Sequence, residues 1–324
     1  MKVLLTGAAG FIGSHSTQAL LKLGHTVVGM DNLNDYYDPK RKLENIEEIK
    51  AGEGSDRFEF IKLDLRDREG LAKLFESHKF DAVVNLGAMA GVRVSIEDPH
   101  LYCDVNLTGT LNLLLECVKH NIGNFVLAST SSAYGATEIM PFVETDPCDR
   151  PLAPYAASKR AAEMMCYTYH HLFGVNCTCL RFFTVYGPRG RPDMMAYKVL
   201  DNIFFDEPCV IYNNGEMWRD WTFVSDIAAG VAAATEKPLG YEIINLGRGE
   251  MVKLADFVEY IENLAGKNSS LKPAPKIAAD IEATSADISK ARRLLGYDPQ
   301  VSVKEGVQHF YEWYEKKVLK NAPA

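Results

Sequence analysis

The sequence is poor in the patterns that mark membrane-bound, secreted and metal-binding proteins. No apolar run approaches the ~20 residues that a membrane span needs, and strand-like residues 2–6 stand where a secretory leader would begin. The seven cysteines are odd in number and lack the spacing of a disulfide framework. The eight histidines form no ligand pattern. We therefore expect a cytoplasmic protein with no membrane segment and no metal site.

Positive charge is also scarce. The 35 Lys and Arg residues are outnumbered by 43 Asp and Glu residues, which gives a net charge of -8. Such a balance argues against nucleic acid as the main partner, although a local basic pocket for a phosphorylated ligand is compatible with it. With 324 residues, 47% of them apolar and 24% charged, the chain suits a soluble protein of one large domain or two interlocked ones.

The first motif is a glycine turn between a strand and a helix. Residues 2–7 read as a buried strand, and residues 12–23 follow a helical pattern. Between them, Gly7 allows a tight turn, Gly10 allows a pyrophosphate to approach the backbone, and Gly13 allows the helix to pack closely on the sheet. The free N–H groups at the start of that helix favour an anion. The motif therefore predicts a dinucleotide site.

An acidic residue ends the next expected strand, residues 26–31. The carboxylate of Asp31 at this position can accept hydrogen bonds from both ribose hydroxyls of the cofactor. It would repel a 2′-phosphate. The sequence therefore predicts NAD, not NADP, as the cofactor.

Strand-like and helical segments alternate through the first 130 residues. Further strands are expected at 58–64, 82–88 and 125–130, with helices at 67–77 and 100–120. This alternation predicts an α/β protein with a Rossmann-type doubly wound parallel sheet, covered by helices on both faces. Its strand ends and its glycine turn are expected to contact the cofactor through Phe11, Ile12, Asn32, Asp64, Leu65, Leu86 and Ala88.

Two residues near the middle of the chain, Tyr155 and Lys159, would share one face of a helix because they are four apart. A phenol has a pKa near ~10, and a neighbouring ammonium favours the phenolate and lowers that pKa. Thr130, where strand 125–130 ends, would place a hydroxyl at the same edge of the sheet. Alone, the pair is also what an ordinary helix contains. A bound dinucleotide would give this tyrosine a reaction to catalyse.

Together these motifs resemble the extended short-chain dehydrogenase/reductase family, and within it the NAD-dependent nucleotide-sugar epimerases, over nearly the whole chain. The resemblance implies that Thr130, Tyr155 and Lys159 form the catalytic set and that Lys159 also binds the nicotinamide ribose. It implies that the segment 181–188, with Phe182, passes the nicotinamide and enters the sugar pocket. It also implies a UDP-sugar substrate.

Three segments favour the UDP-glucuronate 4-epimerases within that family: residues 31–38, 90–95 and 189–194 resemble theirs. Ser131 and Ser132 stand where the dehydratases of the family have an Asp-Glu pair and where the decarboxylases that make UDP-xylose have a Glu. Hydroxyls and cations suit the carboxylate of an acidic sugar. The resemblance implies substrate contacts from Arg93, Ser131, Ser132, Thr184, Arg191, Tyr212, Arg219 and Asp280.

Three alternatives stay open: a 4-epimerase of a neutral UDP-sugar such as UDP-glucose or UDP-N-acetylglucosamine, a UDP-glucuronate decarboxylase, and a non-catalytic dinucleotide-binding scaffold. Arg93 and Arg191 each fit a structural salt bridge about as well as a substrate contact. UDP-galactose 4-epimerases usually carry an Arg three residues before the position of Asp280, where this chain has Ile277. The diphosphate contacts must therefore differ, or Arg191 or Lys198 must take part.

The alternation weakens after about residue 186. Residues 218–224 are expected to return to the main sheet as a strand. We therefore predict a NAD-binding Rossmann domain of residues 1–186 plus 221–247. A smaller mixed α/β part, residues 187–220 plus 248–324, is predicted to bind the UDP-sugar.

Two helices carry apolar residues on more than one face. These residues are Leu111, Leu114 and Leu115 in one helix and Met164, Met165 and Tyr169 in the other. A homodimer would bury such faces, and burial within the monomer is the alternative. We predict the homodimer.

Overall fold

The computed structural model describes residues 1–275 and 280–321. Its centre is a seven-stranded sheet in which every pair of neighbouring strands is parallel. The predicted Rossmann-type α/β fold is confirmed. In spatial order the strands are β10 (Tyr241–Leu246), β6 (Asn176–Phe182), β5 (Asn124–Thr130), β4 (Ala82–Asn85), β1 (Lys2–Thr6), β2 (Thr26–Asp31) and β3 (Phe58–Lys62).

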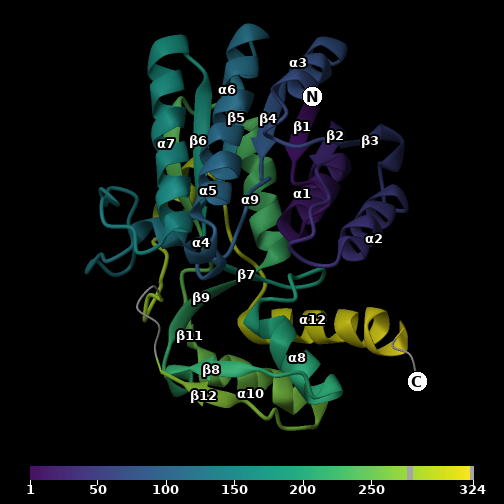
Figure 1. Ribbon diagram of the computed structural model, residues 1–324, viewed down its shortest axis with the longest axis vertical. Coiled ribbons are helices and arrows are strands. Elements are labelled where there is room, and N and C mark those ends of the chain that lie inside the picture. Colours follow the sequence, from purple (N-terminus) through teal and green to yellow (C-terminus); the bar gives the residue numbers. More distant parts are fainter. Residues whose placement is uncertain (276–279, 322–324) are drawn as a thin grey trace.

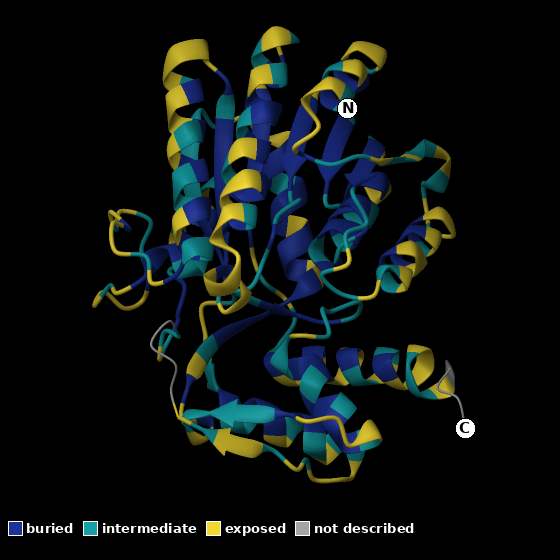
Figure 2. Cartoon of the chain, viewed as in Figure 1, coloured by how far each residue is buried: buried dark blue, intermediate teal, exposed yellow. Residues whose placement is uncertain are grey.

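Helices cover both faces of this sheet (Figure 1). Alternate residues of β1 show why: Val3 and Leu5 pack into the apolar core on one face, and Leu4 into the core on the other. One face carries α1 (Phe11–Lys22), α9 (Val224–Glu236) and α11 (Ser289–Leu295), and the other carries α3 (Arg68–Ser77), α6 (Gly109–Lys119) and α7 (Pro154–Phe173). Because both faces are covered, the five inner strands β6, β5, β4, β1 and β2 are almost entirely buried (Figure 2), while the edge strand β3 is only partly buried.

Shorter segments complete this part of the molecule. α2 (Pro39–Lys50) lies in the polar insertion after β2 and packs on α1. The expected helix 100–120 is a run of α5 (Pro99–Cys103), a π-helical turn (Asp104–Thr108) and α6, and the short α4 (Val94–Glu97) precedes it. No helix among the described residues is long and apolar enough to cross a membrane.

A second region lies below the carboxyl ends of the large sheet in the view of Figure 1. It has its own apolar core, in which the rings of Trp221 and Phe257 stack with centroids 3.8 Å apart. Its elements are β7 (Thr184–Tyr186), α8 (Met195–Phe205), β8 (Val210–Tyr212), β9 (Trp218–Phe223), β11 (Met251–Lys253), α10 (Leu254–Ala265), β12 (Lys272–Ala274) and α12 (Val303–Lys317).

The expected return of residues 218–224 to the main sheet is wrong. β9 pairs with β7 and β11 in a separate three-stranded sheet. The aromatic residues of β9 favour a strand but do not specify its neighbours. Here β7 has already left the large sheet just after β6, and it offers β9 a parallel partner. The division into two domains at the predicted boundaries stays a prediction.

Candidate active site

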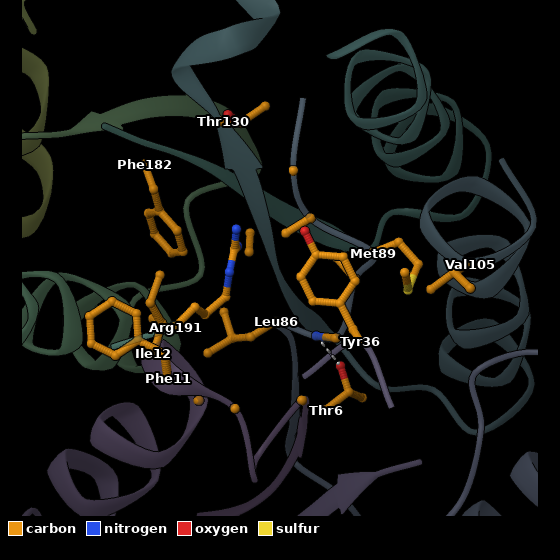
Figure 3. A pocket seen from close by; sticks show the side chains of 18 of the residues that line it. Thr6, Phe11, Ile12, Tyr36, Leu86, Met89, Val105, Thr130, Phe182 and Arg191 are labelled. Atoms are coloured by element: carbon orange, nitrogen blue, oxygen red, sulfur yellow. Dashed lines mark hydrogen bonds between the residues drawn. The ribbon is translucent and has the colours of Figure 1, made fainter. Parts of the chain in front are cut away.

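A cavity of about 420 Å³ opens where the strands of the large sheet end (Figure 3). In parallel α/β sheets this edge is the usual place for a ligand. Every residue predicted to contact the cofactor lines this cavity, and so do the three predicted catalytic residues: Gly7, Gly10, Phe11, Ile12, Gly13, Asp31, Asn32, Asp64, Leu65, Leu86, Ala88, Thr130, Tyr155, Lys159 and Phe182. Their individual roles stay predictions.

The glycine turn has the geometry that a diphosphate needs. Gly7 has a φ of +69°, and a Cβ there would lie 2.8 Å from the Gly87 nitrogen. A Cβ on Gly13 would collide with the Gly7 carbonyl oxygen. Gly10 precedes α1 and has no side chain to bond the first N–H groups of the helix. These donors therefore stay open to an anion from the cavity.

The Asp31 carboxylate is held at the end of β2 by backbone donors. Its oxygens accept from the Ala9 N–H at 3.2 Å and from the Leu33 N–H at 2.8 Å. Burial raises the pKa of Asp31, and the charge of Lys42, whose Nζ lies 4.0 Å from the carboxylate, lowers it. The group lines the cavity with one face, as a ribose-binding carboxylate would.

Lys42 was missed by the sequence reasoning. It is buried in α2, lines the cavity, and donates from Nζ to the Asn34 side-chain oxygen at 2.6 Å. The sequence did indicate this position. Lys42 lies four residues before Ile46 and seven before Ile49, so all three share one face of α2, and that face is buried. Tyr36, from the same insertion, also lines the cavity and was likewise missed.

Asn32 and Asp64 bond to each other at the far end of the cavity. The Asn32 amide donates to the Asp64 carboxylate at 2.9 Å, and Arg66 donates to the same carboxylate. The Arg66 hydrogen bond holds the pKa of Asp64 well below its usual range. Asn32 and Asp64 are thus ordered by protein contacts.

The predicted catalytic residues meet at the junction of β5 and α7. Tyr155 lies in the first turn of α7, and its side chain lines the same cavity as Thr130 at the end of β5. Burial raises the pKa of Tyr155, while the Thr130 hydrogen bond and the charge of Arg191 lower it. Burial also lowers the pKa of Lys159 to about 8, against the opposing charge of Glu163. At neutral pH Lys159 is therefore mostly an ammonium, while the positive charge that lowers the pKa of Tyr155 comes from Arg191 and not from Lys159 as the helical spacing had suggested.

Two buried networks hold α7 in this position. Asn106, in the π-helical turn, bonds both the N–H and the C=O of Met89 and donates to the Ser158 hydroxyl at 3.0 Å. Glu163, fully buried one turn after Lys159, accepts two hydrogen bonds from the Arg181 guanidinium of β6. The helix that carries Tyr155 is therefore tied to its neighbours by neutral hydrogen bonds at Asn106 and by charge-assisted ones at Glu163.

Five of the eight predicted substrate residues converge on a second cavity of about 170 Å³ that adjoins the first: Ser131, Ser132, Thr184, Arg219 and Asp280. The three hydroxyl residues line both cavities. They therefore stand between the predicted nicotinamide site and the predicted nucleotide site.

The other three predicted substrate residues do not line the second cavity. Arg93 donates to Asp280 at 2.7 Å and lies over the Tyr212 ring at 3.9 Å. Arg191 bonds Asp193 through two nitrogens and points into the first cavity (Figure 3). Both arginines thus form salt bridges in this structure. Ile277 lies outside the described residues.

Comparison with known proteins gives the same family. The model of the GDP-mannose 4,6 dehydratase family matches residues 4–310. A UDP-glucuronate 4-epimerase from Thermodesulfobacterium geofontis is 44% identical over 97% of this chain and 96% of its own length. A crystal structure of UDP-glucuronic acid 4-epimerase from Bacillus cereus, in complex with UDP-glucuronic acid and NAD, is similar with a TM-score of 0.88 and 36% identity. It covers 98% of this chain and 99% of its own.

A UDP-glucose 4-epimerase structure from Thermotoga maritima has a TM-score of 0.89 at 28% identity and also covers 98% of this chain and 100% of its own. The fold alone therefore does not separate the acidic-sugar from the neutral-sugar enzymes. Taken with the cavity and its Thr130–Tyr155 pair, these matches show that the chain belongs to the extended short-chain dehydrogenase/reductase family, among its nucleotide-sugar epimerases and their UDP-glucuronate 4-epimerase relatives.

Proposed function

We propose that this protein is a UDP-glucuronate 4-epimerase, which interconverts UDP-glucuronate and UDP-galacturonate. The observation that carries the proposal is the meeting of Tyr155 and Thr130 with the hydroxyls of Ser131 and Ser132 at one cavity. The first pair can move a proton, and hydroxyls without a neighbouring acid suit a sugar carboxylate. The names of the relatives from T. geofontis and B. cereus support the same substrate.

NAD is the cofactor. The open N–H groups at the start of α1 fit its diphosphate, and the Asp31 carboxylate fits the hydroxyls of its adenine ribose. When bound, NAD supplies the acceptor for a hydride from C4 of the sugar and returns that hydride to the opposite face.

Tyr155 is proposed as the acid–base residue. It takes the proton of the C4 hydroxyl as the sugar becomes a 4-ketone, and it gives the proton back when the sugar is reduced. Thr130 donates a hydrogen bond that stabilises the phenolate. Lys159, an ammonium in a buried setting, adds positive charge on the same face of α7. Between the two half-reactions the flat keto sugar turns over in the pocket.

The uronate sets a further requirement, because a 4-keto uronic acid is a β-keto acid and can lose CO2. Loss requires the breaking C–C bond to align with the ketone π system. We propose that Ser131, Ser132 and Thr184 bind the carboxylate and hold it away from that alignment. Among the described residues, the hydroxyls of these three make no hydrogen bond to another residue, so they are open to a ligand.

The nucleotide is proposed to bind at the second cavity. Arg219 and Asp280 line it, as the predicted contacts with the diphosphate and the uridine ribose. Arg93 contacts Asp280, and its charge lowers the pKa of Arg219 after the larger effect of burial. Because Arg93 pairs with Asp280, which lines this cavity together with Arg219, Arg93 is our candidate for the second diphosphate cation.

A homodimer is part of the proposal. Leu114 and Tyr169 are buried within the monomer, but α6 and α7 still expose Leu115, Met164 and Tyr167, with exposed fractions of 41%, 57% and 54%. A second copy of the chain would cover these side chains, as in an isologous interface. We also propose a cytoplasmic location, because the neighbouring thiols Cys166, Cys177 and Cys179 are unpaired in the core, which suits a reducing compartment.

The test is an assay of the purified protein with three substrates in separate reactions: UDP-glucuronate, UDP-glucose and UDP-N-acetylglucosamine. We expect C4 epimerisation of UDP-glucuronate and slower or no turnover of the two neutral sugars. Faster conversion of a neutral sugar would replace this proposal with the neutral-sugar 4-epimerase. Release of a UDP-pentose as the main product would replace it with the decarboxylase.

A further inference from the structure

One segment of the second region lies against the dinucleotide end of the first cavity. Residues 187–194, which we call the strap, join β7 to α8. Two strap residues, Arg191 and Met194, line the cavity together with Phe11 and Ile12 from the start of α1. Figure 3 shows the Arg191 guanidinium inside that cavity, on the side of Leu86. The strap thus forms part of the wall around the predicted diphosphate site.

The strap is anchored to the dinucleotide-binding part through Arg189. Its guanidinium donates to the Gln18 side chain of α1 at 2.6 Å and to His15 Nδ1 at 3.2 Å, and it lies 3.6 Å from the Glu48 carboxylate of α2. The side chain is only 8% exposed. Its backbone has a φ of +63°, a conformation that costs a non-glycine residue free energy. The buried contacts compensate for that cost.

His15 completes the anchor from the helix side. Burial, then the charge of Arg189, lowers the pKa of His15 to about 3, so the ring is neutral at physiological pH. Its Nε2–H can then donate to the Pro188 carbonyl, 2.9 Å away, while Nδ1 accepts from Arg189. The ring also packs edge-on against Phe11, which lines the cavity. One helical turn of α1 therefore contacts both the strap and the cavity.

A second set of hydrogen bonds fixes the strap closer to α8. The Tyr36 hydroxyl donates to the Asp193 carboxylate at 3.3 Å, and Asp193 bonds Arg191 through two nitrogens. Tyr36 belongs to the insertion after β2 and lines the same cavity. The strap is thus fastened at Arg189 to α1 and α2, and at Asp193 to the insertion.

We propose that Arg189 is a positioning residue that keeps the strap closed over the bound dinucleotide and so prevents its loss between the two half-reactions. The inference rests on the proposed use of NAD but not on which sugar is bound. A closed strap has a chemical purpose in such a cycle. The sugar is a ketone at C4 for part of each turnover. A dinucleotide lost at that moment would carry the hydride away, and the keto sugar could not be reduced. Arg191 and Met194 of the strap line the cavity that also carries the start of α1, so the strap is placed to cover the diphosphate.

The test measures release of bound NAD from Arg189→Met, without any sugar nucleotide. The substitution keeps a long side chain but removes every polar contact of the Arg189 guanidinium. We expect NAD to leave at least about tenfold faster than from the wild type, since a buried charged hydrogen-bonded group is lost. We also expect the epimerase activity of this variant to depend on added NAD, and that of the wild type not to. Lys317→Met is the matched control, because Lys317 also pairs with Glu48, at 2.7 Å, but from α12.

Two further variants separate positioning from general destabilisation. Gln18→Met removes one acceptor and should speed NAD release in the same direction by a smaller factor. Arg189→Lys, which keeps the charge but not the fork of donors, should fall between wild type and Arg189→Met. Release at the wild-type rate from folded Arg189→Met and Gln18→Met would overturn the proposal. Failure of the proposed function would appear separately, as wild-type protein that binds NAD but does not epimerise UDP-glucuronate.

Discussion

The two ends of the active site differ in how their polar groups are satisfied. At the dinucleotide end, Asp31 is already bonded to backbone N–H groups, and Asn32 and Asp64 are bonded to each other. At the sugar end, the hydroxyls of Ser131 and Thr184 have no partner among the described residues. The dinucleotide end is therefore preorganised by the fold, while the sugar end keeps its hydrogen-bonding capacity for the substrate.

The largest effect is expected where the two ends meet, at Tyr155. Tyr155→Phe keeps the ring but removes the group that exchanges the proton, and turnover should fall by about 10³-fold or more. Bound NAD should remain, because the dinucleotide end is untouched. Tyr167→Phe, on the exposed face of the same helix, is the control. Turnover by Tyr155→Phe near the wild-type rate would show that another group is the base.

A loss of nucleotide affinity is expected next in size. Arg219→Met removes a cation from the second cavity, and we expect KM for UDP-glucuronate to rise about 30-fold with a smaller change in kcat. Arg93→Met should act in the same direction if Arg93 is the second diphosphate cation. Steady-state kinetics with UDP-glucuronate measures both. A change in kcat alone would place Arg219 at the reacting carbon and contradict the assignment.

Cofactor choice should respond to the charge of Asp31. Asp31→Asn keeps the shape of the side chain but removes the negative charge and one acceptor, so NAD affinity should fall about tenfold. Affinity for NADP should rise, because the repulsion ends while the Lys42 ammonium stays next to the ribose site. Calorimetric titration with both dinucleotides gives the ratio. Glu47→Gln, exposed on α2, serves as the control. An unchanged preference for NAD would remove Asp31 from its proposed role.

The hydroxyls at the sugar end should limit the fraction of the product that is decarboxylated. Ser131→Ala and Thr184→Val each remove about one hydrogen bond to the carboxylate, so the fraction of UDP-pentose should rise by about fivefold. Chromatography of the product mixture measures the fraction. If neither variant yields more decarboxylated product, these hydroxyls do not hold the carboxylate.

A smaller effect concerns the stability of the protein at alkaline pH. Lys159 has a pKa of about 8 in the folded protein, below its value in the unfolded chain, so between these values the unfolded chain binds more protons. The free energy of unfolding should therefore rise with pH. Between pH 7.5 and 9 the wild type should gain about 1 kcal/mol relative to Lys159→Met. Urea unfolding of both proteins at the two pH values measures this difference. A constant difference would contradict a depressed pKa for Lys159.

The same contrast explains what the sequence could and could not predict. The glycine turn, Asp31 and the Tyr155–Lys159 pair depend on local spacing, and all of them line one cavity as expected. The contacts of Arg93 with Asp280 join residues far apart in the chain, and no local pattern reports such a pair.

The errors and omissions have the same origin. β9 was recognised as a strand but placed in the wrong sheet, because its partners depend on where β7 leaves the large sheet. Lys42 lies in a polar segment, and the sequence reasoning did not predict that one face of its helix is buried. The buried amine next to Asp31 was therefore missed. Long-range pairing and the orientation of a single long side chain are set by the packed structure.

The proposed cycle depends on one tyrosine and on one dinucleotide that stays bound between the two half-reactions. The most direct measurement follows UDP-glucuronate deuterated at C4 with purified protein and no added NAD. We predict UDP-galacturonate that keeps the deuterium at C4, since the hydride leaves and returns within one complex. Loss of the deuterium to water, or an absolute requirement of the wild type for added NAD, would contradict the account.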